Sequence, residues 1–449
     1  MIIRIKQFLL FFGDLVCLYL SLFLTLILRY GPNFSQDLWQ QHLAPFSIIY
    51  LIWLIVFYIN DLYDLRISFR KLDFFSALAW SLIINGLIAV LFFYLIPYFG
   101  ITPKTNLFLN LLFFSGLFLF WRLLLSRFMI KIGLVNHIIF ISQNKTSEEI
   151  AQKIENNPVL GYQVIIIRGL ENFSRCAGSR KAGQEIEKII KEKNIKTIIV
   201  DPEIYLQISV KLYDLLPLGI DILSLPTFLE KFERAIPISE TNKEWFLENI
   251  RETSKRTYEI TKRGFEIILS FILGLISLIL YPLIILIIKC SGPGLVFYTQ
   301  ERVGKNNKIF KIIKFRTMIH GAEKNGVQWT NNQDKRITIG GKFLRKTRLD
   351  ELPQLWNIFN GNMSFVGPRP ERPEFIKTLK EQVPHYSLRH LIRPGLTGWA
   401  QINYPYGSSI EDSLKKLSYD LYYLKNRSFI LDLSIILKTI ATVFKLKGR

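Results

Sequence analysis

One apolar run decides how this chain is built: GFEIILSFILGLISLILYPLIILIIK, residues 264–289. It is long enough to cross a bilayer, but Pro282 lies inside it, removes a helical hydrogen bond and bends the axis. Basic residues flank the run on both sides, Lys255, Arg256, Lys262 and Arg263 before it and Lys289, Arg302, Lys305 and Lys308 after it. Because positive charge marks the cytoplasmic side, we expect a re-entrant helix that breaks near Tyr281-Pro282 and returns to the same face. An ordinary kinked span is the alternative.

Four earlier apolar runs are expected to span the membrane, at residues 8–28, 43–59, 74–96 and 107–125. Their basic flanks are asymmetric: one side has Arg4, Lys6, Arg66, Arg70, Lys71, Arg122, Arg127 and Lys131, and the other has Arg29 and Lys104. The positive-inside rule therefore places the N-terminus and everything after Lys131 in the cytoplasm. The first run is too long, and has too many successors, for a cleaved signal peptide.

Composition narrows the class of protein. The 449 residues are half hydrophobic and carry a formal charge of +21. Because the basic residues border apolar runs, they indicate an anionic membrane surface and phosphorylated substrates, and no nucleic-acid partner is expected. The three scattered cysteines, Cys17, Cys176 and Cys290, predict a reducing compartment, and the five histidines form no metal-binding motif.

The middle of the chain reads as a small α/β domain. Short β-rich runs at residues 137–142, 162–168, 196–200 and 219–223 alternate with polar helical stretches, which predicts a parallel sheet. The turn after the first run, residues 142–147, lacks the GxGxxG pattern that brings backbone close to a pyrophosphate. A structural or regulatory role is therefore favoured over dinucleotide binding.

An acidic pair stands out in the last third, in KFLRKTRLDELPQLWN, residues 342–357. Asp350 and Glu351 lie among Lys342, Arg345, Lys346 and Arg348. Pro353 suits the first turn of a helix, and the following leucines repeat at helical spacing, so the pair should lie where the helix dipole favours an anion. The alternative is that Asp350 caps the helix.

Three basic motifs surround this pair in the sequence. Residues 310–318 read as a strand that presents Lys314 and Arg316 on one face. Pro368, Pro370 and Pro373 should hold Arg369 and Arg372 in a stiff loop suited to bidentate phosphate recognition, and Arg393 stands beside a glycine-containing turn that would let backbone approach a ligand. A solvated strand face and a surface turn are the alternatives.

Together these motifs closely resemble the bacterial sugar transferase family, the monotopic phosphoglycosyl transferases. The resemblance rests on KFRTM (314–318), LDELPQL (349–355), MSFVGPRP (363–370) and RPGLTGWAQ (393–401), in this order behind a proline-broken membrane helix. It covers residues 254–449. The four spans and the α/β domain resemble the N-terminal extension of the family's long form, which starts O-antigen and exopolysaccharide assembly.

The resemblance implies a two-step reaction at the cytoplasmic membrane of a bacterium. Asp350 would attack a UDP-hexose, glucose or galactose, releasing UMP, and undecaprenyl phosphate would take the phosphosugar from the carboxylate. Mg2+ would be held by Glu351 and Asp350. Phosphate would be bound by basic residues: Lys314, Arg316, Arg345, Arg348, Arg369, Arg372 and Arg393. For a long-form member, a homodimer is the expected assembly.

The implied fold is a membrane protein of several parts. Four transmembrane helices (1–131) precede a cytoplasmic, degenerate Rossmann-like α/β domain (132–229) and a polar connector (230–263). The re-entrant helix (264–289) then anchors a mainly α-helical catalytic domain (290–449), whose residues 429–444 should lie in the membrane interface with Lys445, Lys447 and Arg449 at the headgroups. Packing of 429–444 on the domain core is the alternative.

Two departures from the family pattern and two other functions stay open. Tyr281 stands where the family often has Ser, and Asn362 where Asp is common. A non-catalytic membrane scaffold or nucleotide sensor in polysaccharide assembly is the alternative function. A processive glycosyltransferase, which would release UDP, is disfavoured because a convincing DxD motif is lacking.

Overall fold

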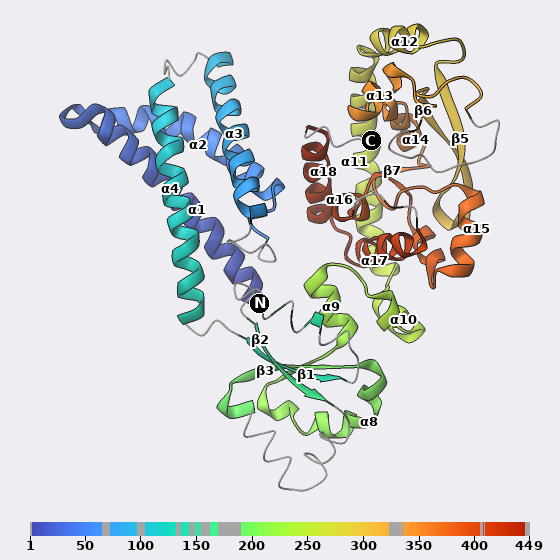
Figure 1. Cartoon of the computed structure of the whole chain (residues 1–449), viewed down its shortest axis with the longest axis horizontal. Coiled ribbons are helices and arrows are strands. Elements are labelled where there is room, and N and C mark those ends of the chain that lie inside the picture. Colours follow the sequence, from blue (N-terminus) through green and yellow to red (C-terminus); the bar gives the residue numbers. More distant parts are fainter. Residues whose placement is uncertain are drawn as a thin grey trace. The chain divides into compact units, whose positions relative to one another are not determined.

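The computed structural model (Figure 1) describes residues 2–64, 72–96, 104–131, 136–142, 149–150, 152, 154, 162–168, 190–322, 334, 336–404, 407 and 409–444. The chain divides into two compact units, residues 1–225 and 226–449. Several residues used above lie outside the described part: Arg66, Arg70, Lys71, Cys176, residues 143–147, Lys445, Lys447 and Arg449.

The first unit begins with four long apolar helices: α1 (Ile2–Tyr30), α2 (Gln36–Ile59), α3 (Leu72–Leu95) and α4 (Lys104–Lys131). Each is long and apolar enough to cross a membrane, which confirms the four predicted spans. Inside the bundle, Arg122 pairs with Asp14 at 2.6 Å, and Asn110 donates to Ser21 Oγ at 2.9 Å. Polar side chains therefore face one another while apolar ones face outward, the arrangement expected in a bilayer.

A parallel sheet follows within this unit, with strand order β2-β1-β3-β4. Its strands are β1 (Asn136–Ser142), β2 (Tyr162–Arg168), β3 (Ile195–Val200) and β4 (Asp221–Ser224), with α8 (Pro202–Tyr213) between the last two. All four predicted strands are present and parallel. Ile198 and Val200 of β3 lie in its hydrophobic core with Ile204 of α8.

The second unit is organised around a bent helix pair, α11 (Arg256–Leu278) and α12 (Tyr281–Cys290). The two axes differ by 59°, and α12 turns across the end of α11 in Figure 1. Leu280 N–H bonds back only three residues, to Ser277 O at 2.9 Å, and Pro282 lies in the first turn of α12, where its missing N–H costs little. The break that the sequence predicts near Tyr281-Pro282 is confirmed.

One polar face of α11 holds it to the rest of the unit. Lys262 Nζ donates to Val366 O at 2.9 Å and pairs with Asp432 at 3.0 Å. Arg263 donates at 2.6 Å to each of two carbonyls at the end of α14, Ile358 O and Phe359 O. The opposite side of α11 is apolar and exposed.

Two small sheets and a set of short helices complete this unit. Strands β5 (Phe297–Val303) and β6 (Ile309–Phe315) pair antiparallel, and β7 (Ser364–Val366) and β8 (Gly395–Thr397) pair in parallel. The remaining helices are α9 (Leu225–Glu233), α10 (Lys243–Asn249), α13 (Ile339–Lys346), α14 (Gln354–Phe359), α15 (Pro373–Gln382), α16 (Trp399–Asn403), α17 (Ile410–Asn426) and α18 (Phe429–Phe444).

The segment predicted as a polar connector contributes to the core of the second unit. Ile236, Trp245 and Phe246 are buried in its largest hydrophobic cluster. Lys425 Nζ pairs with Glu230 at 2.6 Å, and Trp399 Nε1 donates to Arg234 O at 2.9 Å. Apolar residues too sparse to form a pattern in the sequence thus anchor this segment in three dimensions.

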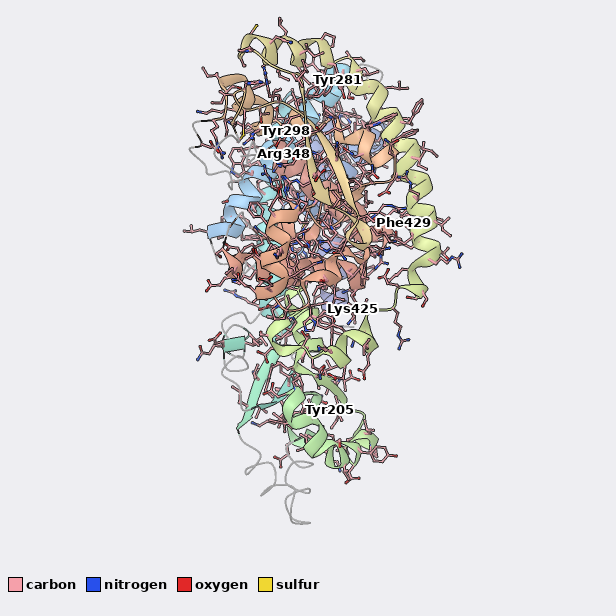
Figure 2. All side chains as sticks on the ribbon, turned by 90° about the vertical axis from the view of Figure 1, so that its right-hand side faces the viewer. Tyr205, Tyr281, Tyr298, Arg348, Lys425 and Phe429 are labelled. Carbon is pink, nitrogen blue, oxygen red and sulfur yellow. The ribbon has the colours of Figure 1, made fainter. Side chains whose placement is uncertain are left out.

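Helix α18 packs on the domain core, as one of the two alternatives from the sequence has it; a position in the membrane interface stays a prediction. Ile435 is fully buried in the domain core, whereas Ile430 and Leu433 are exposed. At its first turn, Phe429 (labelled in Figure 2) packs edge-on against Tyr258 of α11, with ring centroids 5.1 Å apart. One face of α18 therefore packs on the domain while the other stays apolar and open.

Candidate active site

The acidic pair lies in a tight connection between two helices. Helix α13 ends at Lys346, Arg348 adopts a left-handed backbone (φ 60°), and Asp350 and Glu351 follow in a 3-10 turn, residues 349–351. A left-handed conformation is uncommon for a residue with a side chain and concentrates at functional sites. Pro353, rather than Asp350, holds the N-cap position of α14, so Asp350 is not the predicted helix cap.

Helix α14 is shorter than the leucine spacing predicts, with only six residues. Its dipole is therefore a minor source of positive potential. The field at the acidic pair comes from basic side chains instead, and these lie close to Glu351.

Glu351 is surrounded by cations. Lys314 Nζ of β6 lies 2.8 Å from Glu351 Oε1, Arg369 Nη2 lies 3.6 Å from the same oxygen, and Arg348 Nη1 lies 3.9 Å from Oε2. Burial disfavours the charged carboxylate, but Lys314, Arg369 and Arg348 outweigh it and hold the pKa of Glu351 well below its usual range. Glu351 is therefore ionised at neutral pH.

Asp350 is in a different state although it is the next residue. It is 7% exposed, and its Oδ1 has no hydrogen-bond partner among the residues that the structure describes. Burial and then the charge of Glu351 raise the pKa of Asp350 to about 6, against the opposing effect of Lys314, Arg345 and Arg348. At pH 7 the carboxylate is mostly ionised but poorly satisfied, which suits a nucleophile or a general base.

The pair opens into a cavity of about 850 Å³ in the second unit. That volume suits a nucleotide-sized ligand. Tyr298 of β5 and Arg348 both line it and are labelled in Figure 2. Among the described residues its basic lining is Arg302, Lys314, Arg316, Arg336, Arg345, Arg348, Arg369, Arg372, Arg389 and Lys416.

Arg369 is held in place through its backbone. Arg389 Nη2 donates to Arg369 O at 2.9 Å, and Arg302 Nη1 donates to Pro370 O at 2.9 Å. The next carbonyl, Glu371 O, accepts from Val303 N at 3.0 Å. Three consecutive carbonyls are thus fixed, so the loop is as stiff as its prolines predict, and it holds Arg369 in the cavity lining beside Glu351.

The structure brings together six of the seven predicted phosphate-binding residues as lining of this cavity, all except Arg393. Arg345 lies on the last turn of α13 and donates from Nε to Thr317 Oγ1 at 2.8 Å. Arg393 lies elsewhere, donating to Gly361 O at 3.0 Å. Asn362 follows Gly361, is exposed and does not line the cavity. The family's common Asp at this position is therefore replaced by Asn outside the cavity.

Arg316 lines the cavity but also has a structural task. Strand β6 ends at Phe315, and the Arg316 guanidinium donates to Ile288 O at 3.1 Å, Gly292 O at 2.7 Å and Pro293 O at 2.5 Å. It therefore closes the turn after α12. The strand prediction put Lys314 and Arg316 on one face, and in the structure the two side chains diverge.

Gly367, Gly395 and Gly398 lie where two backbone segments pack closely together. A Cβ on Gly367 would collide with Arg393 O and Gly395 N, and one on Gly395 or Gly398 would collide with Gly367. These glycines are therefore required where β7 and β8 run in contact. That the turn after Arg393 also lets backbone approach a ligand stays a prediction.

Two residues that organise the site were not predicted from the sequence. Arg302 was noted only as a basic residue after the apolar run 264–289, and Arg389 was not singled out at all. Arg389 is buried, pairs with Asp420 of α17 at 2.8 Å and donates to Tyr386 Oη at 2.5 Å. It stands apart from every motif in the sequence. Its contact with the Arg369 loop becomes visible only in the structure, where it lies buried beside Asp420.

The donor set for a metal is small. No group of three or more His, Cys, Asp and Glu side chains able to hold a metal occurs within the described ranges. Asp350 Oδ1 is a buried oxygen without a hydrogen-bond partner among the described residues, and the adjacent Glu351 supplies a second carboxylate. Two carboxylates fit Mg2+, which commonly takes one or two such ligands and completes its shell with phosphate oxygens and water.

Comparison with known proteins agrees with the motifs. The sequence profile described as "Bacterial sugar transferase" matches residues 257–446. The chain is 42% identical to a UDP-N-acetylgalactosamine-undecaprenyl-phosphate N-acetylgalactosaminephosphotransferase of Aeromonas hydrophila, over 41% of this chain and 44% of the relative. It is 39% identical to a UDP-glucose:undecaprenyl-phosphate glucose-1-phosphate transferase of Escherichia coli K12, over 40% of this chain and 39% of the relative.

A shorter relative is matched almost completely. The chain is 39% identical to the exopolysaccharide production protein PSS of Rhizobium leguminosarum bv. phaseoli, over 41% of this chain and 94% of the relative. The match thus spans less than half of the two long relatives but nearly all of the short one.

Proposed function

The chain belongs to the bacterial sugar transferase family, and from this we propose that it transfers a hexose 1-phosphate from a UDP-hexose to undecaprenyl phosphate, releasing UMP. The product is an undecaprenyl-diphosphate-linked sugar, the first membrane-bound intermediate of exopolysaccharide or O-antigen synthesis. The observation that carries the proposal is the buried Asp350 carboxylate, whose Oδ1 lacks a protein partner among the described residues and opens into a strongly basic cavity.

In the first step, Asp350 acts as the nucleophile. Its carboxylate oxygen attacks the β-phosphorus of the UDP-hexose, an O–P bond forms, and the bond from that phosphorus to the bridging oxygen breaks. The electron pair leaves with UMP, and the sugar phosphate stays on Asp350 as an acyl phosphate. A covalent intermediate divides one difficult transfer between two bulky anions into two smaller steps.

In the second step, a phosphate oxygen of undecaprenyl phosphate attacks the same phosphorus. The bond to Asp350 breaks, and the free carboxylate is restored. Fixed cations stabilise the charge on the transferring group in both steps, because they need not reorganise as it moves. Lys314, Arg348 and Arg369 are the nearest to the pair and, with Arg345, are assigned this role.

Glu351 positions these cations. Its carboxylate keeps Lys314 and Arg369 gathered beside Asp350 when no diphosphate is bound. Asp350 and Glu351 would also hold Mg2+, which when bound would neutralise charge on the phosphate oxygens.

The membrane arrangement follows from the same reaction. We propose that α11 and α12 form a re-entrant helix in the cytoplasmic leaflet of the inner membrane and that the cavity faces the cytoplasm, where UDP-sugars are made. The 59° bend and the basic residues on both flanks support this arrangement. A homodimer remains part of the proposal for the full chain.

Glucose and galactose were expected from the sequence, and the relatives' names add N-acetylgalactosamine to the sugars to be tried. The experiment is UMP release by the full chain in lipid nanodiscs, with undecaprenyl phosphate, Mg2+ and each UDP-sugar in turn. Asp350→Asn should abolish both UMP release and the phosphosugar adduct detected by mass spectrometry. Asp221→Asn, an exposed strand residue of the first unit, is the matched control.

A fully active Asp350→Asn protein would overturn the mechanism. Absence of UMP with every UDP-sugar, together with tight nucleotide binding to residues 137–226, would favour the scaffold or sensor instead. Release of UDP in place of UMP would indicate a glycosyltransferase.

A further inference from the structure

Helix α13 has two faces with different tasks. Its inner face holds the active site: Leu344 is buried against Ile284 and Ile288 of α12, and Arg345 reaches Thr317 beside the acidic pair. Its outer face is formed by Ile339, Lys342, Phe343 and Lys346, spaced i, i+3, i+4 and i+7, and all four are exposed. This outer face has no role in the cavity.

The two apolar side chains of that face are unusually open. Ile339 is 90% exposed and Phe343 is 52% exposed. Scattered apolar residues are normal on a protein surface, but a patch that continues into a neighbouring apolar surface marks an interaction site. Here it does continue, because Gly340, the neighbour of Ile339 in α13, lies against Ile287 of α12 and against Ser291, which follows that helix. Leu283 and Leu286 of α12 are exposed as well.

The rim of the cavity near α12 is also apolar. Leu295 and Ile319 line the cavity and are 80% and 51% exposed. Leu295 follows the turn that Arg316 closes after α12, so this rim is fixed to the bent helix pair. The route from the apolar surface of α12 to Asp350 therefore passes over hydrophobic side chains, whereas the cavity interior is basic.

We propose that the outer face of α13 is a docking surface for the cytoplasmic leaflet and guides the lipid acceptor into the site. Ile339 and Phe343 enter the edge of the hydrocarbon, Lys342 and Lys346 contact lipid phosphates, and a polyprenyl phosphate reaches Asp350 across Leu295 and Ile319. Continuity with α12 and the alternation of apolar and cationic side chains identify an anionic bilayer surface as the occupant. The proposal rests on the proposed function, since it concerns the acceptor of that reaction.

If this surface docks on the membrane, changing it should affect transfer to undecaprenyl phosphate but not the first step, the release of UMP. Ile339→Ser combined with Phe343→Ser should raise the KM for undecaprenyl phosphate at least about tenfold, because each change removes buried apolar area from the docked state. The single-turnover burst of UMP without acceptor should persist, and so should turnover with a short, water-soluble prenyl phosphate. The matched control is Lys243→Ser with Leu247→Ser on α10, an exposed pair with the same i, i+4 spacing on the same unit.

A second measurement does not depend on activity. A nitroxide attached at Phe343→Cys, in a chain otherwise free of cysteine and held in nanodiscs with anionic lipid, should collide more with oxygen than with a water-soluble nickel complex. The same label at Leu247→Cys should show the opposite preference. A water-exposed label at 343 with an unchanged KM for undecaprenyl phosphate would overturn the docking surface, while loss of UMP release by the unmodified chain would instead overturn the proposed function.

Discussion

Two clusters of buried acids lie in the second unit, and they differ in how their oxygens are satisfied. Asp432 accepts from Tyr423 Oη at 2.7 Å on one oxygen and from Tyr258 Oη at 2.6 Å on the other, which also pairs with Lys262 at 3.0 Å. Asp350 Oδ1, by contrast, has no hydrogen-bond partner among the described residues. The two acids are about equally buried.

Burial alone therefore does not identify a reactive carboxylate. A buried charge whose hydrogen bonds are complete contributes to fixing the fold, as Asp432 does between α11, α17 and α18. A buried carboxylate left short of partners costs stability, and proteins keep such a group where it has a chemical task. The predictions below test this difference, beginning with the largest expected effect.

Asp350→Glu should lower kcat for UMP release by about a hundredfold or more, because one extra methylene displaces the attacking oxygen by about 1 Å. Thermal stability should change little, since the carboxylate has few contacts to lose. Asp432→Glu should do the reverse, disturbing a fully bonded site and lowering Tm while the folded fraction keeps its rate. If Asp350→Glu and Asp432→Glu lowered the rate equally, the proposed difference between a reactive and a structural carboxylate would be wrong.

Lys262→Met should destabilise the second unit by about 3 kcal/mol, because it leaves the Asp432 charge buried without its cation. Thermal unfolding in nanodiscs measures this loss. Arg256→Met, at the exposed first residue of α11, is the control and should leave Tm nearly unchanged. A stable Lys262→Met protein would show that the network contributes little to holding α11.

The rate of UMP release should fall with pH as Asp350 takes up a proton. Burial and Glu351 raise the pKa of Asp350 to about 6, so nearly all Asp350 side chains are ionised at pH 7.5. Below pH 6 the ionised fraction, and with it the rate, should decrease about tenfold per pH unit. Single-turnover rates between pH 5 and 8 measure this. A rate that stays constant down to pH 4.5 would mean that Asp350 ionises as an ordinary, solvated acid.

Asp350→Asn should raise Tm at pH 7.5 by a few degrees. A carboxyl whose pKa is about 6 in the folded chain, against an ordinary value of 3.8, binds its proton more tightly when folded, so its ionisation lowers stability as pH rises through that interval. The neutral amide avoids this loss. The gain in Tm should disappear near pH 4, because the Asp350 carboxyl of the folded chain is then protonated and as uncharged as the amide. A gain that persists at pH 4 would show that it comes from packing and not from charge.

Much of the fold could be read from composition and spacing. The four membrane helices, the parallel strands and the break at Pro282 are each encoded by local patterns: apolar length, alternation, and a residue that cannot donate a backbone hydrogen bond. The burial of Trp245 and Phe246 in the core could not be predicted from the sequence, because these residues lie in a charged stretch and the residues they pack against are far along the chain.

At the site, the sequence by itself determined which chemical groups are present: an adjacent pair of acids, several arginines, and prolines that stiffen the loop around Arg369. Tertiary structure alone decided which of them meet. It sends Arg393 to Gly361 and turns Arg316 toward three carbonyls, and it brings Arg389 to the Arg369 loop from a segment without any motif. It also makes the two acids unequal, because three cations converge on Glu351 while Asp350 loses water and keeps an unbonded oxygen. Ionisation and hydrogen bonding depend on burial and on neighbours from distant segments, which local sequence does not contain.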